Sequence, residues 1–124
     1  MKLIIGGAYQ GKLEFAKTAF GIEDTEVFTC KDCEIDFTKP CIHHIEEFTL
    51  ACIRAGVDPI AYFKDHKEAW KDSILICRDL FCGVVPLQAE LRAWRQDTGR
   101  LCQYLSKEAE SVSRIFCGLE QKLK

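Results

Sequence analysis

Lys2-Leu3-Ile4-Ile5 is a short apolar run, and Gly6-Gly7-Ala8-Tyr9-Gln10-Gly11 follows it directly as a glycine-rich loop. Residues 12–20 then carry apolar side chains at helical spacing, and Gly21 stands where a helix C-cap is expected. An apolar strand, a glycine-rich loop and a helix, in this order, are typical of the first strand–helix unit of an α/β protein. This N-terminal segment therefore predicts the α/β class.

The loop fits most of the phosphate-binding pattern G-x-x-x-x-G-K followed by Ser or Thr, with Gly6, Gly11 and Lys12 at the required spacing. Glycines let the backbone curl so that several N–H groups point at one centre, and the following helix N-terminus favours anions. Lys12 adds a positive charge for the outer phosphates. Leu13 stands where a hydroxyl should ligate Mg²⁺, so Mg²⁺ coordination is expected to be weakened. The structural alternative is a glycine-rich turn with a surface lysine. The predicted nucleotide-binding residues are Gly6, Gly7, Ala8, Tyr9, Gln10, Gly11, Lys12 and Leu13.

Strand and helix patterns alternate along the rest of the chain. We expect strands at 26–30, 41–44, 73–78 and 112–117, helices at 45–55, 58–70 and 89–109, and a small additional strand in the tail 118–124. Such alternation predicts one three-layer α/β domain over residues 1–124, with a mainly parallel sheet covered on both faces. Ligands bind at the carboxyl ends of such strands. The loop after Ile5, the turn at His43 and the loop after Arg78 should therefore meet at one edge.

Composition excludes several classes of protein. The chain has 124 residues, is 48% hydrophobic and 29% charged, and carries a net charge of −2. These values are typical of one soluble domain and do not support a nucleic-acid partner or a membrane surface. No apolar run reaches the ~20 residues that a bilayer requires, and the N-terminus does not resemble a signal peptide. We therefore expect a cytoplasmic protein whose eight cysteines are reduced.

Several side chains near the expected strand ends are candidates for chemistry. Asp79 follows an apolar strand and could hold a metal or accept a hydroxyl proton, or it could cap a turn. Glu46 and Glu47 could act as strand-end acids, although two acids in a first helical turn also complement the helix dipole. His43 and His44 could be nucleophiles or a switch, or simply polar loop residues. Lys12 and Asp79 are the candidate catalytic residues.

A rival interpretation is a zinc-clipped interaction module. Cys30 and Cys33 form a C-x-x-C pair, and Cys41 with His43 or His44 could complete a tetrahedral shell. The spacing after Cys33 is short, and no second knuckle follows.

Two further segments resemble one family. Residues 74–86, ILICRDLFCGVVP, resemble the motif V-L-V-x-N-E-V-G-x-G-I-V-P, and residues 94–103, WRQDTGRLCQ, resemble F-R-D-x-x-G-R-V-N-Q. The N-terminal loop is similar to G-G-A-R-S-G-K-S, and residues 116–124 are similar to S-G-I-x-x-x-I-K. These motifs belong to the bifunctional adenosylcobinamide kinase / adenosylcobinamide-phosphate guanylyltransferase family of cobalamin biosynthesis. Members are typically near 180 residues long, so this chain resembles a shortened form.

The resemblance implies a P-loop NTPase-like fold and two activities. One is phosphoryl transfer from ATP or GTP to a hydroxyl of adenosylcobinamide, a corrinoid, and the other is guanylyl transfer from GTP through a histidine adduct. It also implies a homotrimer. Arg95 and Arg100 match family positions and could meet phosphate or a neighbouring subunit, whereas Arg92 and these two could equally be solvated. Trp94 falls in the apolar stripe of the long helix and is expected in the core.

The chain departs from the family pattern at five places, one of which is that no aspartate follows the middle strand, near His43-His44-Ile45-Glu46. Leu13 replaces Ser or Thr, Arg78-Asp79 replaces an Asn-Glu pair, and Phe81 replaces a glycine. The guanylylated histidine should lie in a helix between the second and middle strands, but only ten residues separate Cys30 from Cys41. That helix is absent from the pattern. The three histidines of the chain do not match it: His43, His44 and His66.

These departures argue against guanylyl transfer and weaken the case for a kinase. Two function classes therefore stay open beside the zinc module. One is a cobinamide kinase-type phosphotransferase or nucleotidyltransferase, and the other is a non-catalytic nucleotide- or corrinoid-binding regulator or subunit partner.

Overall fold

The computed structural model describes residues 1–80 and 88–124. Six strands form one sheet in the order β2-β3-β4-β1-β5-β6. The first five strands in this order run parallel, and β6 runs antiparallel to β5. The strands are β1 (Lys2–Gly6), β2 (Val27–Thr29), β3 (Cys41–His43), β4 (Ile74–Arg78), β5 (Ser111–Phe116) and β6 (Leu119–Lys122). The helices are α1 (Lys12–Phe20), α2 (Ile45–Ala55), α3 (Pro59–Asp65), α4 (Lys67–Trp70) and α5 (Ala89–Glu108), with a 3₁₀ turn at Asp24–Glu26. The predicted α/β class with a mainly parallel sheet is confirmed.

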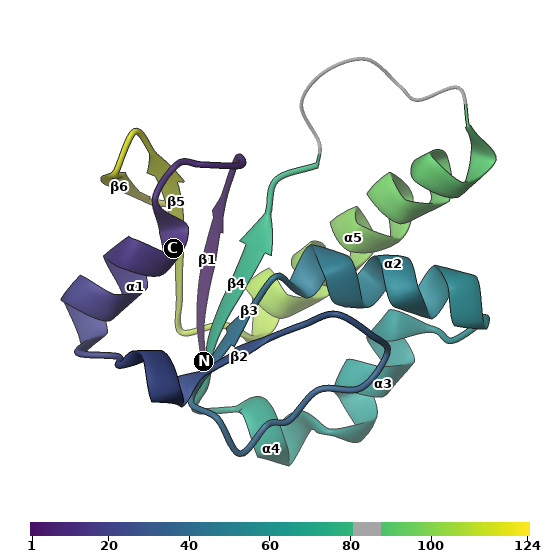
Figure 1. Ribbon diagram of the computed structural model, residues 1–124, viewed down its shortest axis with the longest axis horizontal. Helices are drawn as coiled ribbons and strands as arrows, with labels where there is room; N and C mark the ends of the chain where they lie inside the picture. Colours follow the sequence, from purple (N-terminus) through teal and green to yellow (C-terminus); the bar gives the residue numbers. More distant parts are fainter. Residues whose placement is uncertain (81–87) are drawn as a thin grey trace.

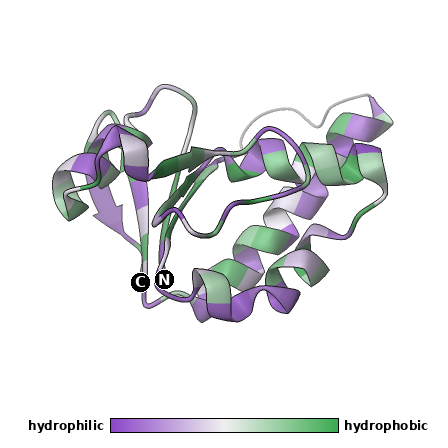
Figure 2. Ribbon diagram, turned by 60° about the horizontal axis from the view of Figure 1, so that its bottom comes forward, coloured by the Kyte–Doolittle hydropathy of each residue, from purple (hydrophilic) through white to green (hydrophobic). Residues whose placement is uncertain are grey.

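The two central strands are apolar on both sides because both faces of the sheet are covered. Leu3 of β1 pairs with Leu75 of β4 and faces the larger core, whereas Ile4 pairs with Ile76 and faces the smaller one. Near-continuous apolar runs are typical of such doubly covered parallel strands. Figure 2 shows the hydrophobic residues gathered on the central strands and on the helix sides that face them.

Helices lie on both faces, as Figure 1 shows, with α1 on one side and α2, α3, α4 and α5 on the other. The larger core receives Phe48 from α2, Phe63 from α3, Trp70 from α4 and Leu101 from α5, all at most 1% exposed. The smaller core receives Ala16 from α1. None of the helices in the described ranges combines the length and the apolar character needed to cross a membrane.

The single helix predicted over 58–70 is wrong, because the chain breaks at His66 into α3 and α4. Asp58 caps the first part as predicted, and its side chain accepts from the N–H groups of Ile60 and Ala61. In a continuous helix, the Phe63 carbonyl would accept from residue 67. Here it accepts instead from the Trp70 indole at 2.7 Å and from the His66 N–H at 3.3 Å.

The C-terminal tail forms the small strand that the sequence predicted. β6 joins β5 through the two-residue turn Cys117-Gly118, in which both residues have positive φ, 51° and 76°. A two-residue turn with positive φ at both central positions has a backbone twist that matches the right-handed twist of the flanking strands. Residues 81–87, which include the last six residues of the family-like motif over 74–86, among them Phe81, lie outside the described residues.

Candidate functional site

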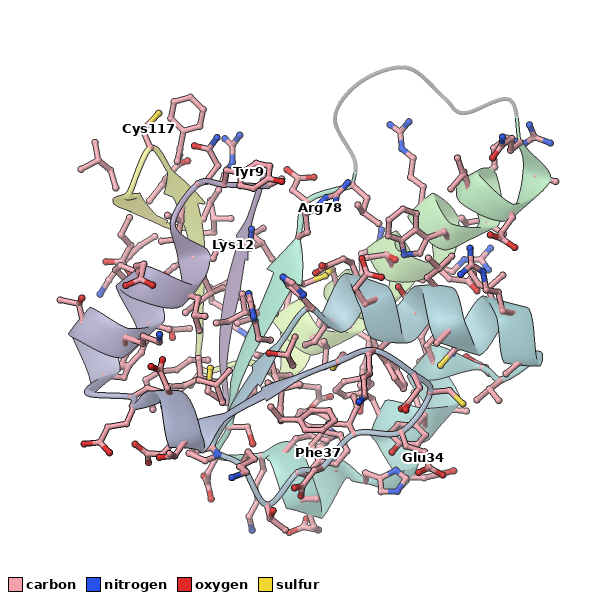
Figure 3. All side chains as sticks on the ribbon, viewed as in Figure 1. Tyr9, Lys12, Glu34, Phe37, Arg78 and Cys117 are labelled. Carbon is pink, nitrogen blue, oxygen red and sulfur yellow. The ribbon has the colours of Figure 1, made fainter. Side chains whose placement is uncertain are left out.

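Three strand ends meet at one pocket, as the parallel topology predicted. The loop after β1, the residues after β3 and the end of β4 line a cavity of about 330 Å³ at the carboxyl edge of the sheet. Figure 3 shows Tyr9 and Arg78 at the top of this edge, with Lys12 below them. The pocket therefore lies where ligands bind in open α/β sheets.

The loop itself depends on glycine at two points. A Cβ on Gly6 would lie 2.6 Å from the Ile115 carbonyl oxygen and 3.3 Å from Cγ of Lys12, so a side chain cannot enter without a shift. Gly11, directly before α1, has φ 91°. L-residues avoid this region, and Tyr9 also adopts it, at φ 61°, with its side chain fully exposed. These conformations curl the loop around the start of α1.

Lys12 is the buried cation of the pocket. The residue is 8% exposed, and its Nζ donates to the Gly7 carbonyl oxygen at 2.7 Å. Burial lowers the pKa of Lys12, and it outweighs the opposing attraction of Glu46. The first N–H groups of α1 have no partner inside the helix, as at any helix N-terminus. Positive charge and free donors therefore face the same cavity.

Glu46 forms the opposite wall at the start of α2. It is only 2% exposed, and its Oε1 accepts the Arg78 N–H at 2.9 Å. Its backbone carbonyl accepts from the Trp94 indole at 2.7 Å. Glu46 therefore does more than complement the helix dipole, because its carboxylate also links α2 to β4 next to Lys12. Glu47 is half-buried and also lines the pocket.

Arg78 and Trp94 lie beside this wall. The Arg78 guanidinium carbon is 5.9 Å from the Trp94 ring centroid, within the range of a cation–π contact. Trp94 is half-buried rather than part of the core that the helical stripe predicted. It instead joins α5 to the pocket through Glu46 and Arg78.

The two histidines lie side by side in the pocket. The ring centroids of His43 and His44 are 3.9 Å apart. Burial, and then the positive charges of His44, Lys12 and Lys17, lower the pKa of His43 to about 4. His43 is therefore a neutral imidazole at neutral pH. His44 precedes α2 with φ 61°, in the same left-handed region as Gly11.

Asp79 lies at the base of the loop, since its backbone N–H donates to the Gly6 carbonyl oxygen at 2.7 Å. The described residues that line the pocket include Glu46 but not Asp79. Arg92, Arg95 and Arg100 lie on α5 and are likewise outside this lining, with Arg100 3.9 Å from Asp97.

The zinc interpretation is wrong for the cysteine cluster. Cys30 packs in the larger core and Cys41 in the smaller one, so the sheet lies between them. Across residues 1–80 and 88–124, no group of three His, Cys, Asp or Glu side chains is placed to hold a metal ion. The alternating direction of strand side chains explains this separation.

The sequence reasoning did not detect how the loop is held from the far end of the chain. The Gln10 side-chain Oε1 accepts the Cys117 N–H at 2.6 Å, and the Gln10 backbone carbonyl accepts the Gly118 N–H at 2.9 Å. Gln10 itself carries no signal for these contacts. The Cys117-Gly118 pair between two short strands was the only available hint of a tight turn.

No protein-family model matches this chain, and no curated protein matches it either.

Proposed function

We propose that this chain binds the phosphate groups of a nucleotide, GTP or ATP, in the pocket between the loop 6–13 and the start of α2. The observation that carries the proposal is Lys12, a buried ammonium group at the N-terminus of α1 that contacts the loop carbonyl of Gly7. A desolvated cation inside a curled glycine loop favours an oxyanion. A bound phosphate would take the place of the Gly7 carbonyl as the partner of Lys12.

The residues of the pocket suit phosphate better than they suit a magnesium ion. Lys12 and Arg78 offer positive charge, and the loop offers backbone N–H groups. Magnesium that accompanies a nucleotide neutralises phosphate charge, but Leu13 supplies no oxygen to hold it. Glu14, Glu46 and Glu47 also line the pocket, but one Glu46 oxygen already accepts the Arg78 backbone N–H. Among the described residues, no three His, Cys, Asp or Glu side chains are placed to hold a metal ion.

Two functions follow from nucleotide binding, and both start from the family-like motifs. The chain could be a shortened, P-loop-type relative of the cobinamide kinase / guanylyltransferase family that transfers a phosphoryl group to a corrinoid hydroxyl. Alternatively, it binds a nucleotide or a corrinoid without transfer, as a regulator or subunit partner. Leu13 and Arg78 favour the second function, because Leu13 lacks the hydroxyl that would hold a metal and Arg78 replaces the asparagine of the family-like motif. A homotrimer belongs to the same proposal.

Calorimetric titration tests the binding step. Purified protein is titrated with GTP, ATP and pyrophosphate, with and without Mg²⁺, beside Lys12→Ala and the control Lys107→Ala. Lys107 is an exposed lysine in the last turn of α5. We expect micromolar binding that Lys12→Ala abolishes and Lys107→Ala retains. Equal binding by both variants, or none by the wild type, would contradict a phosphate site at this loop.

Transfer is tested separately with labelled GTP and cobinamide. Product that forms only with Mg²⁺ supports the kinase function. Nucleotide binding that is indifferent to Mg²⁺, with no labelled product, supports the non-catalytic function.

A further inference from the structure

The turn between β5 and β6 presents two backbone N–H groups that the hairpin itself does not use. In a two-residue hairpin turn, the ladder bonds run between the flanking residues, here Phe116 and Leu119. The N–H groups of Cys117 and Gly118 therefore point out of the hairpin. Both are accepted by one residue of the phosphate loop, Gln10.

Gln10 accepts hydrogen bonds from the turn through two different oxygens. Its side-chain Oε1 lies 2.6 Å from the Cys117 nitrogen, and its backbone oxygen lies 2.9 Å from the Gly118 nitrogen. The residues on either side of Gln10, Tyr9 and Gly11, both have left-handed φ. The two bonds therefore hold the loop at the point where its backbone adopts the left-handed conformation.

The two backbones also pack closely at this point. A Cβ on Gly11 would lie 3.6 Å from the Gly118 Cα, which is ordinary van der Waals contact. Deeper in the same corner, Gly6 approaches the Ile115 carbonyl of β5. Figure 3 places Tyr9 and Cys117 at the same edge, although the residues are 108 positions apart in the chain. The loop therefore contacts β5 at Gly6 and the β5–β6 turn at Gln10 and Gly11.

We propose that the β5–β6 turn is a positioning element for the phosphate loop, and that Gln10 is the positioning residue through which it acts. The inference rests on the proposed function, since it assumes that the loop binds phosphate. Left-handed backbone at Tyr9 is unfavourable and persists only where surrounding contacts hold it. Without the turn, the loop relaxes, its N–H groups no longer converge, and phosphate affinity falls.

A matched pair of glycine variants isolates this effect. Gly118 and Gly21 have similar φ, 76° and 65°, and a Cβ at either position meets no atom within 4 Å. Gly118→Val and Gly21→Val therefore introduce similar left-handed strain at positions where the added Cβ has open space, one at the turn and one at the end of α1. Gly118→Asn is the conservative rescue, because asparagine tolerates this conformation.

The measurements are pyrophosphate affinity by calorimetry, thermal midpoint, and hydrogen exchange of the peptide that covers residues 6–13 without ligand. We expect both valine variants to lose similar thermal stability. Only Gly118→Val should lose affinity, roughly tenfold, and accelerate exchange in the loop. Gly118→Asn should restore both. Gln10→Ala, which keeps the backbone bond, should lose roughly threefold to fivefold in affinity, and the exposed control Gln103→Ala should lose none.

Equal affinity and equal loop exchange in the two valine variants would overturn the proposal. If the wild type binds no pyrophosphate, the proposed function fails, and exchange alone decides the rest. Faster loop exchange in Gly118→Val would then still support the turn as the support of the loop, and unchanged exchange would overturn that as well.

Discussion

Two corners of this molecule turn a parallel strand into a helix at the same edge of the sheet. One joins β1 to α1, and the other joins β3 to α2. Each helix starts after a residue with left-handed φ, Gly11 at 91° and His44 at 61°, and neither residue caps its helix with a side-chain hydrogen bond. The corners differ in length, since residues 7–11 form the first and His44 alone forms the second.

The difference in chemistry follows the difference in length. The short corner places Glu46 and Glu47 in the first turn of α2, where their carboxylates complement the helix dipole. The long corner places Lys12 at the start of α1, where Glu14 is the one acid of the first turn. The two helix starts therefore place a buried lysine and a buried glutamate along the lining of one pocket. The proposed function places the phosphate groups at the first corner.

The largest expected effect concerns space at the first corner. Gly6→Ala places a Cβ 2.6 Å from the Ile115 backbone oxygen, whereas a Cβ on Gly7 meets only Cγ of Gln10, at 3.6 Å. Because backbone cannot move aside cheaply, we expect Gly6→Ala to lower the free energy of unfolding by about 3 kcal/mol. Gly7→Ala should change it by less than about 1 kcal/mol. Urea unfolding measures both, and equal losses would show that the corner is not tightly packed.

The second prediction separates the two acids of the other corner. Glu46→Ala leaves the Arg78 N–H without its acceptor in a buried site, so we expect a loss of about 2 kcal/mol in unfolding free energy. Glu47→Ala, at a half-buried position, should lose less than about 1 kcal/mol. Chemical denaturation of both variants is the measurement. A larger loss for Glu47→Ala would mean that dipole complementation, rather than the bond to β4, matters most.

The third prediction concerns His43, which ends β3 at the second corner and lines the pocket between the two corners. Its pKa is about 4 in the folded chain and near 6.5 when unfolded, so the unfolded state binds more protons between these values. Folding stability should therefore fall as pH decreases from 6.5 to 4. After allowance for solvent screening, we expect wild type to lose about 1.5 kcal/mol more than His43→Gln between pH 7 and pH 4.5. Parallel pH profiles for the two proteins would contradict a neutral, half-buried His43.

Helix bounds could be predicted from the sequence wherever local chemistry decides them. α1 and α2 begin and end at the predicted residues, because Gly21 and Gly56 adopt the left-handed C-cap conformation. The helix over 58–70 could not be predicted correctly. Its break depends on the Trp70 indole reaching the Phe63 carbonyl, a packing contact that hydrophobic periodicity does not report.

The candidate site divides in the same way. Parallel topology predicted that the loop after β1, the turn at His43 and the loop after Arg78 would meet, because strand ends share one edge. The pocket brings the first two together with Arg78 itself. Burial of Glu46 and the bonds from Gln10 to the β5–β6 turn depend on how distant elements pack. Cys30 and Cys41 illustrate the opposite error. Their spacing in the sequence suits a metal site, but the sheet lies between the two side chains.

The smallest expected effect compares the residues that directly precede the two helices. His44→Gly relieves left-handed strain but removes the ring that packs against His43, so the unfolding free energy should rise by only about 0.5 kcal/mol. Gly11→Ala introduces the same strain at the first corner and should lower it by about 1 kcal/mol. Thermal unfolding distinguishes the expected gain in stability of His44→Gly from the expected loss of Gly11→Ala. His44→Gly also removes a positive neighbour of His43, so the pKa of His43, followed by NMR titration, should rise. If His44→Gly destabilises the chain, the contact between the two histidine rings, rather than the backbone conformation, determines the second corner.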